Sequence, residues 1–332
     1  MVFKILQIKK YKLEVKKNIC VIGAGEWGGN HIKTLFDLDA LGGVVDKNKN
    51  NLNLVSKKFP DCQLYSTLDD NVIKKFDGFV IATEPASHFE LAKKVILGSK
   101  PVLVEKPLTL DYNSSKSLCE MSKEMNVNLM VGHVLLFHPA FVKMKEIVKN
   151  GKIGEIQYIY SNRLNMGKFR TNENVFWSFA PHDIALLNYF FDETPSNVNS
   201  NGIDILQKGI HDTSITSFDY RGKKMAHIFV SWLHPFKEHR FVIIGSKGML
   251  HFEDSMSTKP LLLYNNKAEF INKIPSPTKG GVKKIDYNNE QPLANELKYF
   301  ISNLYKKIKI SSGEDGLEVV KILEQASANL IH

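Results

Sequence analysis

Three glycines with a fixed spacing are the first residues in this sequence that point to chemistry. Gly23, Gly25 and Gly28 stand in G-x-G-x-x-G order within VIGAGEWGGNH. The first glycine of such a pattern permits a tight turn, the second lets the backbone approach a pyrophosphate, and the third allows close packing of a helix on a strand. The helix that follows offers unpaired N–H groups and a positive dipole end to phosphates. We therefore predict a dinucleotide site, which includes the flanking Glu26 and Trp27.

An acidic residue farther along indicates which dinucleotide is bound. Asp46 ends the segment GGVVD, about 20 residues beyond the glycines. A carboxylate at this place accepts hydrogen bonds from a ribose 2′-hydroxyl and repels a 2′-phosphate, so it favours NAD over NADP. A flavin or an S-adenosylmethionine ligand can use a similar turn, so the glycines alone leave the ligand open.

The elements around these residues are predicted to form βαβ units. Short apolar runs alternate with helix-length amphipathic segments, which is typical of a parallel sheet. The strands are expected at 18–23, 42–46, 76–83, 101–107 and 128–133. The helices between them are expected at 27–38, 87–98 and 111–125.

The pattern changes beyond about residue 139. Longer alternating segments follow, and they suit a mixed, largely antiparallel sheet with one open face; they are IQYIYSNRL, TSITSFDY and KMAHIFVSWL. Two helices are expected near the end, at 290–308 and 314–330. We therefore predict an α/β protein with a basic N-terminal extension, an NAD-binding Rossmann domain and a substrate-binding domain, at residues 1–17, 18–138 and 139–332 respectively.

Length and composition agree with two globular domains. The chain has 332 residues, 43% of them hydrophobic and 24% charged, and a single hydrophobic core stops growing near roughly 250 residues. No run approaches the about 20 uncharged apolar residues that cross a bilayer, so we expect no membrane partner. Lysines interrupt the apolar start of the chain, which argues against a signal peptide and for a cytoplasmic location.

Cysteine usage predicts neither disulfides nor a metal site. Cys20, Cys62 and Cys119 form no CxxC pair and have no histidine at metal-ligand spacing. Free thiols fit the cytoplasmic interpretation.

The net charge of +9 is concentrated at the N-terminus. Residues 1–17 contain six lysines and one glutamate, which leaves a net +4 for the other residues. This distribution is weak support for a nucleic-acid groove, and we expect no nucleic-acid partner. A solvated extension is the preferred interpretation, and a tail for lipid surfaces or nucleic acid is the alternative.

Five segments together resemble one protein family. From residue 18 onward the chain is similar to the Gfo/Idh/MocA sugar and cyclitol dehydrogenases, and the resemblance rests on GAGEWGGNH, IATEPASH, VLVEKPLTL, GHVLLFHPAF and GLEVVKILEQA. It implies a Rossmann domain joined to an α/β domain with an open mixed sheet that often serves oligomerisation. We therefore expect an NAD-dependent oxidoreductase that forms a homodimer or homotetramer.

The resemblance also implies two catalytic residues. Lys106 of the EKP tripeptide would lie beside the nicotinamide and steady alkoxide character on the reacting hydroxyl. His182 would act as the general base, since the unperturbed pKa of histidine, about 6.5, lies near working pH. The family often has an aspartate where this chain has Ser178, so no carboxylate role is expected at that position. Asp183, which follows His182 directly, is assigned to the substrate site and can orient or support the base. Thr83, His88 and Glu105 are assigned, with Lys106, to the cofactor site.

The segment that precedes His182 is rich in cations and amides. Such side chains can clamp phosphate and bond sugar hydroxyls, although a solvated loop is the alternative; the predicted substrate residues are Arg163, Asn165, Lys168, Arg170, Asn174 and Trp177. The segment is similar to family branches that oxidise nucleotide-linked amino sugars at C3 for surface polysaccharide or lipid sugar biosynthesis. UDP-N-acetylglucosamine is the favoured substrate. The alternatives are its uronate, another sugar or cyclitol, and a non-catalytic NAD-binding sensor.

Overall fold

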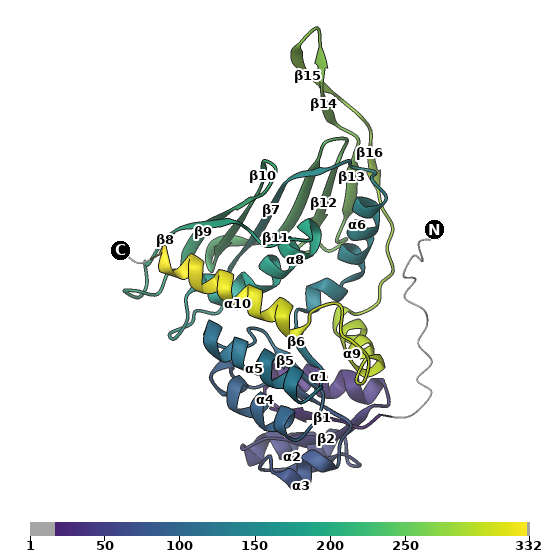
Figure 1. Ribbon diagram of the computed structural model, residues 1–332, viewed down its shortest axis with the longest axis vertical. Coiled ribbons are helices and arrows are strands. Elements are labelled where there is room, and N and C mark those ends of the chain that lie inside the picture. The colour runs from purple at the N-terminus through teal and green to yellow at the C-terminus, as the bar shows by residue number, and fades with distance from the viewer. Residues whose placement is uncertain (1–16, 331–332) are drawn as a thin grey trace. The chain divides into compact units, whose positions relative to one another are not determined.

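The protein divides into two compact units. A computed structural model describes residues 17–330 (Figure 1). The first unit comprises the described residues up to Gly132 together with Gln291–Gly316, and the second comprises His133–Glu290 and the residues from Leu317 onward. The predicted boundary at 138 lies close to the structural one, but residues 291–316 join the first unit and not the second. The predicted extension, except for Lys17, lies outside the described residues.

The first unit contains a six-stranded parallel sheet in the order β3-β2-β1-β4-β5-β6. The strands are β1 (Ile19–Ile22), β2 (Leu41–Val45), β3 (Gln63–Tyr65), β4 (Gly78–Ile81), β5 (Val102–Glu105) and β6 (Leu129–Gly132). This order is that of the Rossmann fold, with the direction of winding reversed between β1 and β4. The predicted fold class is confirmed for this unit.

Helices cover both faces of this sheet. They are α1 (Glu26–Asp37), α2 (Lys49–Lys58), α3 (Asp70–Lys74), α4 (His88–Leu97), α5 (Tyr112–Glu124), α9 (Pro292–Ser302) and the start of α10 (Gly313–Ala328), with a 3₁₀ turn η1 (Pro85–Ser87). Right-handed crossovers place the helix after β1 and the helix after β4 on opposite faces. Helix α9 packs against α1, while α4 packs against α5.

Four strands of this sheet are buried along their whole length because both faces of the sheet are covered. Every residue of β1, β4, β5 and β6 is buried, as expected of parallel strands between two helical layers. Their carboxyl ends meet at one edge of the sheet, where such folds bind ligands. The glycine turn follows β1 there, Asp46 follows β2, and Lys106 follows β5.

The second unit contains an eight-stranded sheet in the order β16-β13-β12-β11-β7-β10-β9-β8. Strands β7 and β10 run parallel, and the other neighbouring pairs run antiparallel. The strands are β7 (Ile156–Met166), β8 (Asn197–Ile203), β9 (Thr213–Tyr220), β10 (Lys224–Ser231), β11 (Leu233–Gly245), β12 (Met249–Glu253), β13 (Leu261–Tyr264) and β16 (Val282–Lys284). The hairpin of β14 (Lys267–Ile271) and β15 (Ile274–Thr278) extends beyond this sheet (Figure 1).

One face of this sheet is covered and the other is open. The covering elements include η2 (Val134–Phe137), α6 (Pro139–Lys149), α7 (Val175–Phe179), α8 (Pro181–Phe191) and the later part of α10. Aromatic rings fill the covered side, where the Phe141 ring lies 5.2 Å from those of Phe241 and Phe252. Burial alternates along β9 and β10, so each strand has one buried side and one more exposed side. This is the predicted open, mixed and mostly antiparallel sheet.

No helix among the described residues is long and apolar enough to cross a membrane. Cys20, Cys62 and Cys119 are free thiols.

Candidate functional site

The glycine turn has the geometry that a pyrophosphate requires. Gly23 has a φ of +96°, which favours glycine, and a Cβ added at Gly28 would lie only 2.0 Å from the Gly23 carbonyl oxygen. A Cβ at Gly25 would meet no described atom within 4 Å, so open space lies over this residue. Gly25 is also the N-cap of α1 and, among the described residues, no side chain caps it. The N–H groups of the first turn therefore remain available to an anion.

Asp46 joins the end of β2 to the glycine turn. Its Oδ2 accepts hydrogen bonds from the Ala24 N–H at 2.7 Å and from the Asn51 amide at 3.0 Å. Its Oδ1 accepts one from the Asn48 N–H at 2.7 Å. A carboxylate has about four lone-pair positions, so capacity remains for a ribose hydroxyl. The turn and the acid thus fit a bound NAD.

Glu105 connects the start of α1 with the chain at Lys106. Its Oε1 accepts hydrogen bonds from the Trp27 indole at 2.5 Å and lies 2.7 Å from His31 Nε2, while its Oε2 accepts the Lys106 N–H at 3.1 Å. Burial alone would raise the pKa of this carboxyl. The hydrogen bonds and charges of His31, Trp27 and Lys106 outweigh burial and lower the pKa of Glu105.

The carboxylate of Glu105 lies directly over Gly132. A Cβ on Gly132 would come within 3.0 Å of the Glu105 carboxyl carbon, so a larger residue at the end of β6 would press on this carboxylate. The Lys106–Pro107 peptide that follows Glu105 is cis.

His88 ties the loop after β4 to the loop after β5. Its Nδ1 lies 2.9 Å from the Pro107 carbonyl oxygen, and its Nε2 lies 3.1 Å from the Thr83 carbonyl oxygen. Burial lowers the pKa of His88, and a neutral ring donates to one of these two oxygens at a time. The Thr83 hydroxyl bonds the Ser87 hydroxyl at 2.6 Å. His88 therefore positions the walls of the predicted cofactor site.

In the second unit, His182 lies in the first turn of α8. Pro181 begins this helix, and the His182 ring meets the buried ring of His133 edge to face at 6.5 Å. The next residue, Asp183, is fully buried. The helix start thus places one partly exposed imidazole next to one buried carboxylate.

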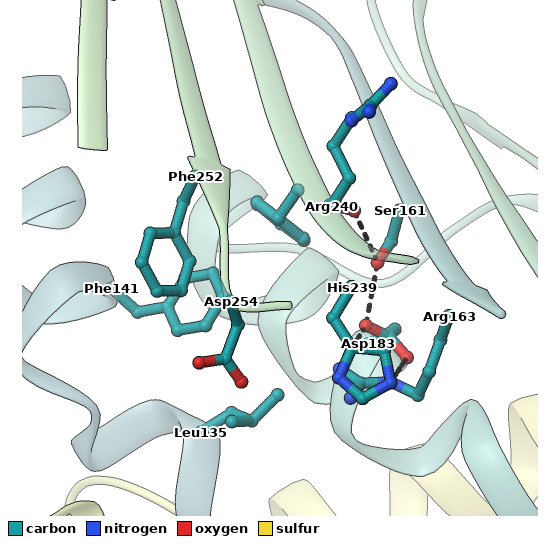
Figure 2. A pocket seen from close by; sticks show the side chains of 10 residues that line it. Leu135, Phe141, Ser161, Arg163, Asp183, His239, Arg240, Phe252 and Asp254 are labelled. Carbon is teal, nitrogen blue, oxygen red and sulfur yellow. Dashed lines mark hydrogen bonds and ion pairs between the residues drawn. The ribbon is translucent and has the colours of Figure 1, made fainter. Parts of the chain in front are cut away.

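Asp183 is held by two side chains from β7 (Figure 2). Its Oδ1 accepts hydrogen bonds from the Ser161 hydroxyl at 2.7 Å and from Arg163 Nη2 at 3.0 Å, and its Oδ2 accepts one from Arg163 Nε at 2.8 Å. Burial would lower the pKa of Arg163, but the charge and hydrogen bonds of Asp183 raise it. The predicted clamp residue Arg163 is therefore engaged by Asp183, because the two face each other in the interior.

A small cavity adjoins this ion pair. Its volume is about 10 Å³, and its walls include Leu135, Phe252, His239 and Asp254 (Figure 2). Sites for small molecules usually enclose about 300–1,000 Å³, so this cavity is too small for a sugar. Burial lowers the pKa of His239 to about 4, and the positive charge of Arg163 adds to this effect.

The other predicted substrate residues have different surroundings. Asn174 caps α7 by accepting the Trp177 N–H at 3.0 Å, and the Trp177 indole donates to Ser327 on α10 at 2.8 Å. Among residues 17–330 no partner bonds Asn165 Oδ1, which is buried. Lys168 and Arg170 are exposed, and the Arg170 guanidinium lies 3.6 Å from Glu173.

The structure thus gathers the predicted residues into two groups. The first unit brings the glycine turn, Asp46, Trp27, Glu105 and Lys106 to one edge of its sheet. The second unit brings Arg163 and Asp183 together beside His182, with Lys168 and Arg170 on the surface segment that precedes α7.

Sequence reasoning missed the buried partners of these residues. His31 bonds Glu105. A fully buried carboxyl, Glu296 on α9, also lies close to Glu105, and burial together with the charge of Glu105 raises the pKa of Glu296. The available signal was weak: Glu296 falls on an otherwise apolar helical face, where an acid is uncommon.

Comparison with protein families supports both units. Residues 17–133 match the oxidoreductase family with an NAD-binding Rossmann fold, and residues 141–251 match the GFO/IDH/MocA C-terminal domain. These matches agree with the predicted fold, with NAD as cofactor and with oxidoreductase activity.

The individual relatives are named for different substrates. UDP-N-acetylglucosamine 3-dehydrogenase from Acidithiobacillus ferrooxidans is 27% identical over 184 residues, which cover 55% of this chain and 57% of that protein. Inositol 2-dehydrogenase from Rhizobium meliloti is 22% identical over 331 residues, covering 92% of this chain and 94% of that protein. A solved structure of the Acidithiobacillus enzyme superposes with a TM-score of 0.83 at 21% identity, covering 95% of this chain and 98% of that one. The structural likeness concerns the fold.

Proposed function

We propose that this chain, which belongs to the Gfo/Idh/MocA oxidoreductase family, oxidises C3 of a nucleotide-linked N-acetyl amino sugar, with UDP-N-acetylglucosamine as the favoured substrate. The observation that carries the choice is the surface segment of the second unit with Lys168 and Arg170. Both side chains are exposed, and two exposed cations in one short segment suit the diphosphate of a nucleotide sugar. A neutral cyclitol offers no comparable charge. The relative named UDP-N-acetylglucosamine 3-dehydrogenase adds support.

In the proposed reaction, Lys106 and His182 act on the substrate hydroxyl. The glycine turn and Asp46 would hold NAD, which would supply the hydride acceptor for oxidation of the carbon that carries this hydroxyl. The Lys106 ammonium steadies the negative charge that develops on the oxygen. The His182 imidazole takes the hydroxyl proton, and Asp183 holds the first turn of α8 that carries this ring.

The structure divides the proposed roles of the three cations Arg163, Lys168 and Arg170. Because Arg163 is paired with the buried Asp183, we assign it to positioning α8. Lys168 and Arg170 keep the proposed role of binding the diphosphate, whose remote binding energy can orient the sugar ring. Asn174 and Trp177 shape the same segment through the cap of α7 and the bond to Ser327.

A product assay tests the substrate. The protein is incubated with NAD and with UDP-N-acetylglucosamine, its uronate, free N-acetylglucosamine or myo-inositol, and a 2-oxo acid is added to reoxidise NADH that stays bound. Mass spectrometry should detect a 3-keto UDP-sugar and little product from the free sugar. Oxidation of myo-inositol with neither UDP-sugar converted would refute the substrate and support a cyclitol dehydrogenase. No oxidation of any of them, with NAD bound, would favour the sensor.

Variants test the proposed groups separately. Lys106→Ala and His182→Ala should lower kcat about 10²- to 10⁴-fold while leaving NAD binding nearly intact. Lys168→Ala and Arg170→Ala should mainly raise KM for the UDP-sugar. Lys152→Ala, an exposed lysine of the same unit, is the matched control. If Lys152→Ala and Lys168→Ala raise KM equally, Lys168 does not bind the diphosphate.

The open face of the second sheet supports a homo-oligomer. Met225, Tyr158, Ile244, Met249 and Tyr264 stand side by side on neighbouring strands. A continuous apolar row of this kind suits burial against a second copy. Light scattering after gel filtration should give a dimer or tetramer, and a charge at the row, Met225→Glu, should dissociate it.

A further inference from the structure

Glu296 on α9 is a buried acid that none of the proposed roles uses. Its side chain is fully buried, and neither carboxyl oxygen has a hydrogen-bond partner among the residues that the structure describes. Most buried polar groups are hydrogen-bonded, and an exception is a reason to look for a function. Glu296 stands outside every motif that identified the cofactor site.

The surroundings of Glu296 connect it to that site. Helix α9 packs against α1, which carries Trp27 and His31. Both of these side chains bond Glu105, and Glu105 is the charged group that acts on Glu296. The buried Nδ1 of His31 also has no partner among residues 17–330. Among the described residues, the titratable group that acts on Glu296 is thus Glu105, at the end of β5 beside Lys106, and His31 of α1 bonds this same carboxylate.

The two carboxyls have opposite tendencies. Burial, with the charge of Glu105 in addition, raises the pKa of Glu296 well above its usual value. Hydrogen bonds from His31 and Trp27 lower the pKa of Glu105 in spite of its burial. When the environments of two neighbouring acids separate their pKa values in this way, one stays neutral while the other is charged.

A neutral acid in this place lowers stability at neutral pH. The unfolded chain ionises Glu296 near its ordinary pKa of about 4.3, whereas the folded protein keeps the proton to a higher pH. The folded state then binds more protons than the unfolded state, so stability decreases as the pH rises from about 4.3 to the folded pKa. Glutamine would fill the same volume without this loss. A structural role therefore gives no reason for an acid here.

We propose that Glu296 is a positioning residue for the cofactor site. While Glu296 is neutral, Glu105 is the charged member of this pair of carboxyls. Ionisation of Glu296 adds a second negative charge and weakens the binding of NADH. The second negative charge would act on Glu105, and through it on Trp27 at the start of α1 and on the main chain of Lys106. The N-terminus of α1 is the proposed pyrophosphate site, so added negative charge on the groups that bond Trp27 there opposes binding. The role in turnover rests on the proposed function, but the effect on NADH does not.

The coupling between ionisation of Glu296 and binding of NADH can be tested without a sugar substrate. NADH affinity of the full chain is titrated by nicotinamide fluorescence from pH 7 to 10 for the wild type, Glu296→Gln and Glu120→Gln. Glu120 is an exposed acid on α5 of the same unit and serves as the matched control. The wild type and the control should lose affinity at alkaline pH roughly 5- to 150-fold more than Glu296→Gln, which is the usual range for two coupled sites.

Thermal unfolding and proton uptake give independent measurements. Glu296→Gln should melt above the wild type at pH 8, and this difference should decrease toward pH 4. Because coupling is reciprocal, NADH binding at alkaline pH should take up protons in the wild type and take up fewer in Glu296→Gln. Calorimetry in buffers of different ionisation enthalpy measures this uptake.

The outcomes separate this inference from the proposed function. Identical alkaline loss of NADH affinity in all three proteins overturns the inference, as does a Glu296→Gln protein that melts below the wild type at every pH. Glu296→Met repeats the test with an apolar side chain of similar size. If no sugar is oxidised but Glu296→Gln abolishes the alkaline loss, the proposed function fails and the role of Glu296 in cofactor binding stands.

Discussion

Asp183→Ala is expected to destabilise the second unit strongly, because it leaves the buried Arg163 cation without its partner. Asp183 accepts three hydrogen bonds, at 2.7, 2.8 and 3.0 Å, and the Arg163 side chain is only 16% exposed. Breaking one partner of a buried ion pair costs about 3–5 kcal/mol. In a domain of this size, each kcal/mol lowers Tm by about 2–4 °C, so Tm should decrease by roughly 6–20 °C.

A double-mutant cycle measures whether the lone cation is the cause. Unfolding in urea is followed for Asp183→Ala, Arg163→Met and the double variant. The double variant should lose less stability than the sum of the single variants, because neither charge remains in the interior. Glu146→Ala is the control, since its ion pair with Lys143 lies at the surface and should contribute about 0–1 kcal/mol. A loss below about 1 kcal/mol for Asp183→Ala, or additive losses, would refute the reasoning.

The same variants test the position of His182. If Asp183 holds the first turn of α8, Asp183→Ala should decrease kcat while NADH affinity stays near that of the wild type. Unchanged kcat, measured below the lowered Tm, would show that His182 does not depend on this ion pair.

Three further predictions concern the cofactor turn and the interior of the second unit. Gly28→Ala should abolish NADH binding, since its Cβ would lie 2.0 Å from the Gly23 carbonyl oxygen. A Cβ at Gly29 would meet no described atom within 4 Å, so Gly29→Ala should instead stabilise α1 by up to about 1 kcal/mol. Equal effects of the two variants on NADH affinity would contradict the packing argument. Asp46→Ala should decrease the preference for NADH over NADPH in fluorescence titrations, and a wild type that binds NADPH equally well would remove Asp46 from this role. Burial lowers the pKa of His239 to about 4, so the unfolded chain binds the extra proton between about pH 6.5 and 4. This histidine should therefore cost roughly 3 kcal/mol of stability as the pH falls through this window. His138, whose pKa burial also lowers to about 4, contributes in the same window, so His239→Gln should decrease the dependence without abolishing it, as measured by urea unfolding at pH 4.5 and 7.

The Rossmann elements were predictable because their signals are local. A glycine turn between an apolar strand and an amphipathic helix requires a backbone geometry that few other residues allow. The predicted helix at 27–38 corresponds to α1 at Glu26–Asp37, and the predicted helix at 111–125 to α5 at Tyr112–Glu124. The strand β3 was not predicted, since its three residues carry no clear alternation.

The roles of charged residues were less predictable, because sequence does not show which charges are buried together. Arg163 and Lys168 belong to one cation-rich segment, yet Arg163 alternates into the covered face of β7 and Lys168 lies beyond the end of that strand. A period of two along the strand separates buried from open positions. It does not reveal that Asp183, from a helix 20 residues later, accepts the guanidinium.

Glu296 shows the same limit at the level of domains. Its helix follows the second sheet in the sequence, so the sequence assigned residues 290–308 to the substrate domain, whereas the structure places α9 in the first unit against α1. An acid on the apolar face of a helix predicts burial only if the partner of that face is known. With α1 as that partner, the buried acid lies close enough to Glu105 for the charge of Glu105 to raise the pKa of Glu296. If Glu296 has the proposed role, a truncation after the Rossmann motifs would remove a residue that cofactor binding needs, and full affinity for NADH should require the first unit with α9 included.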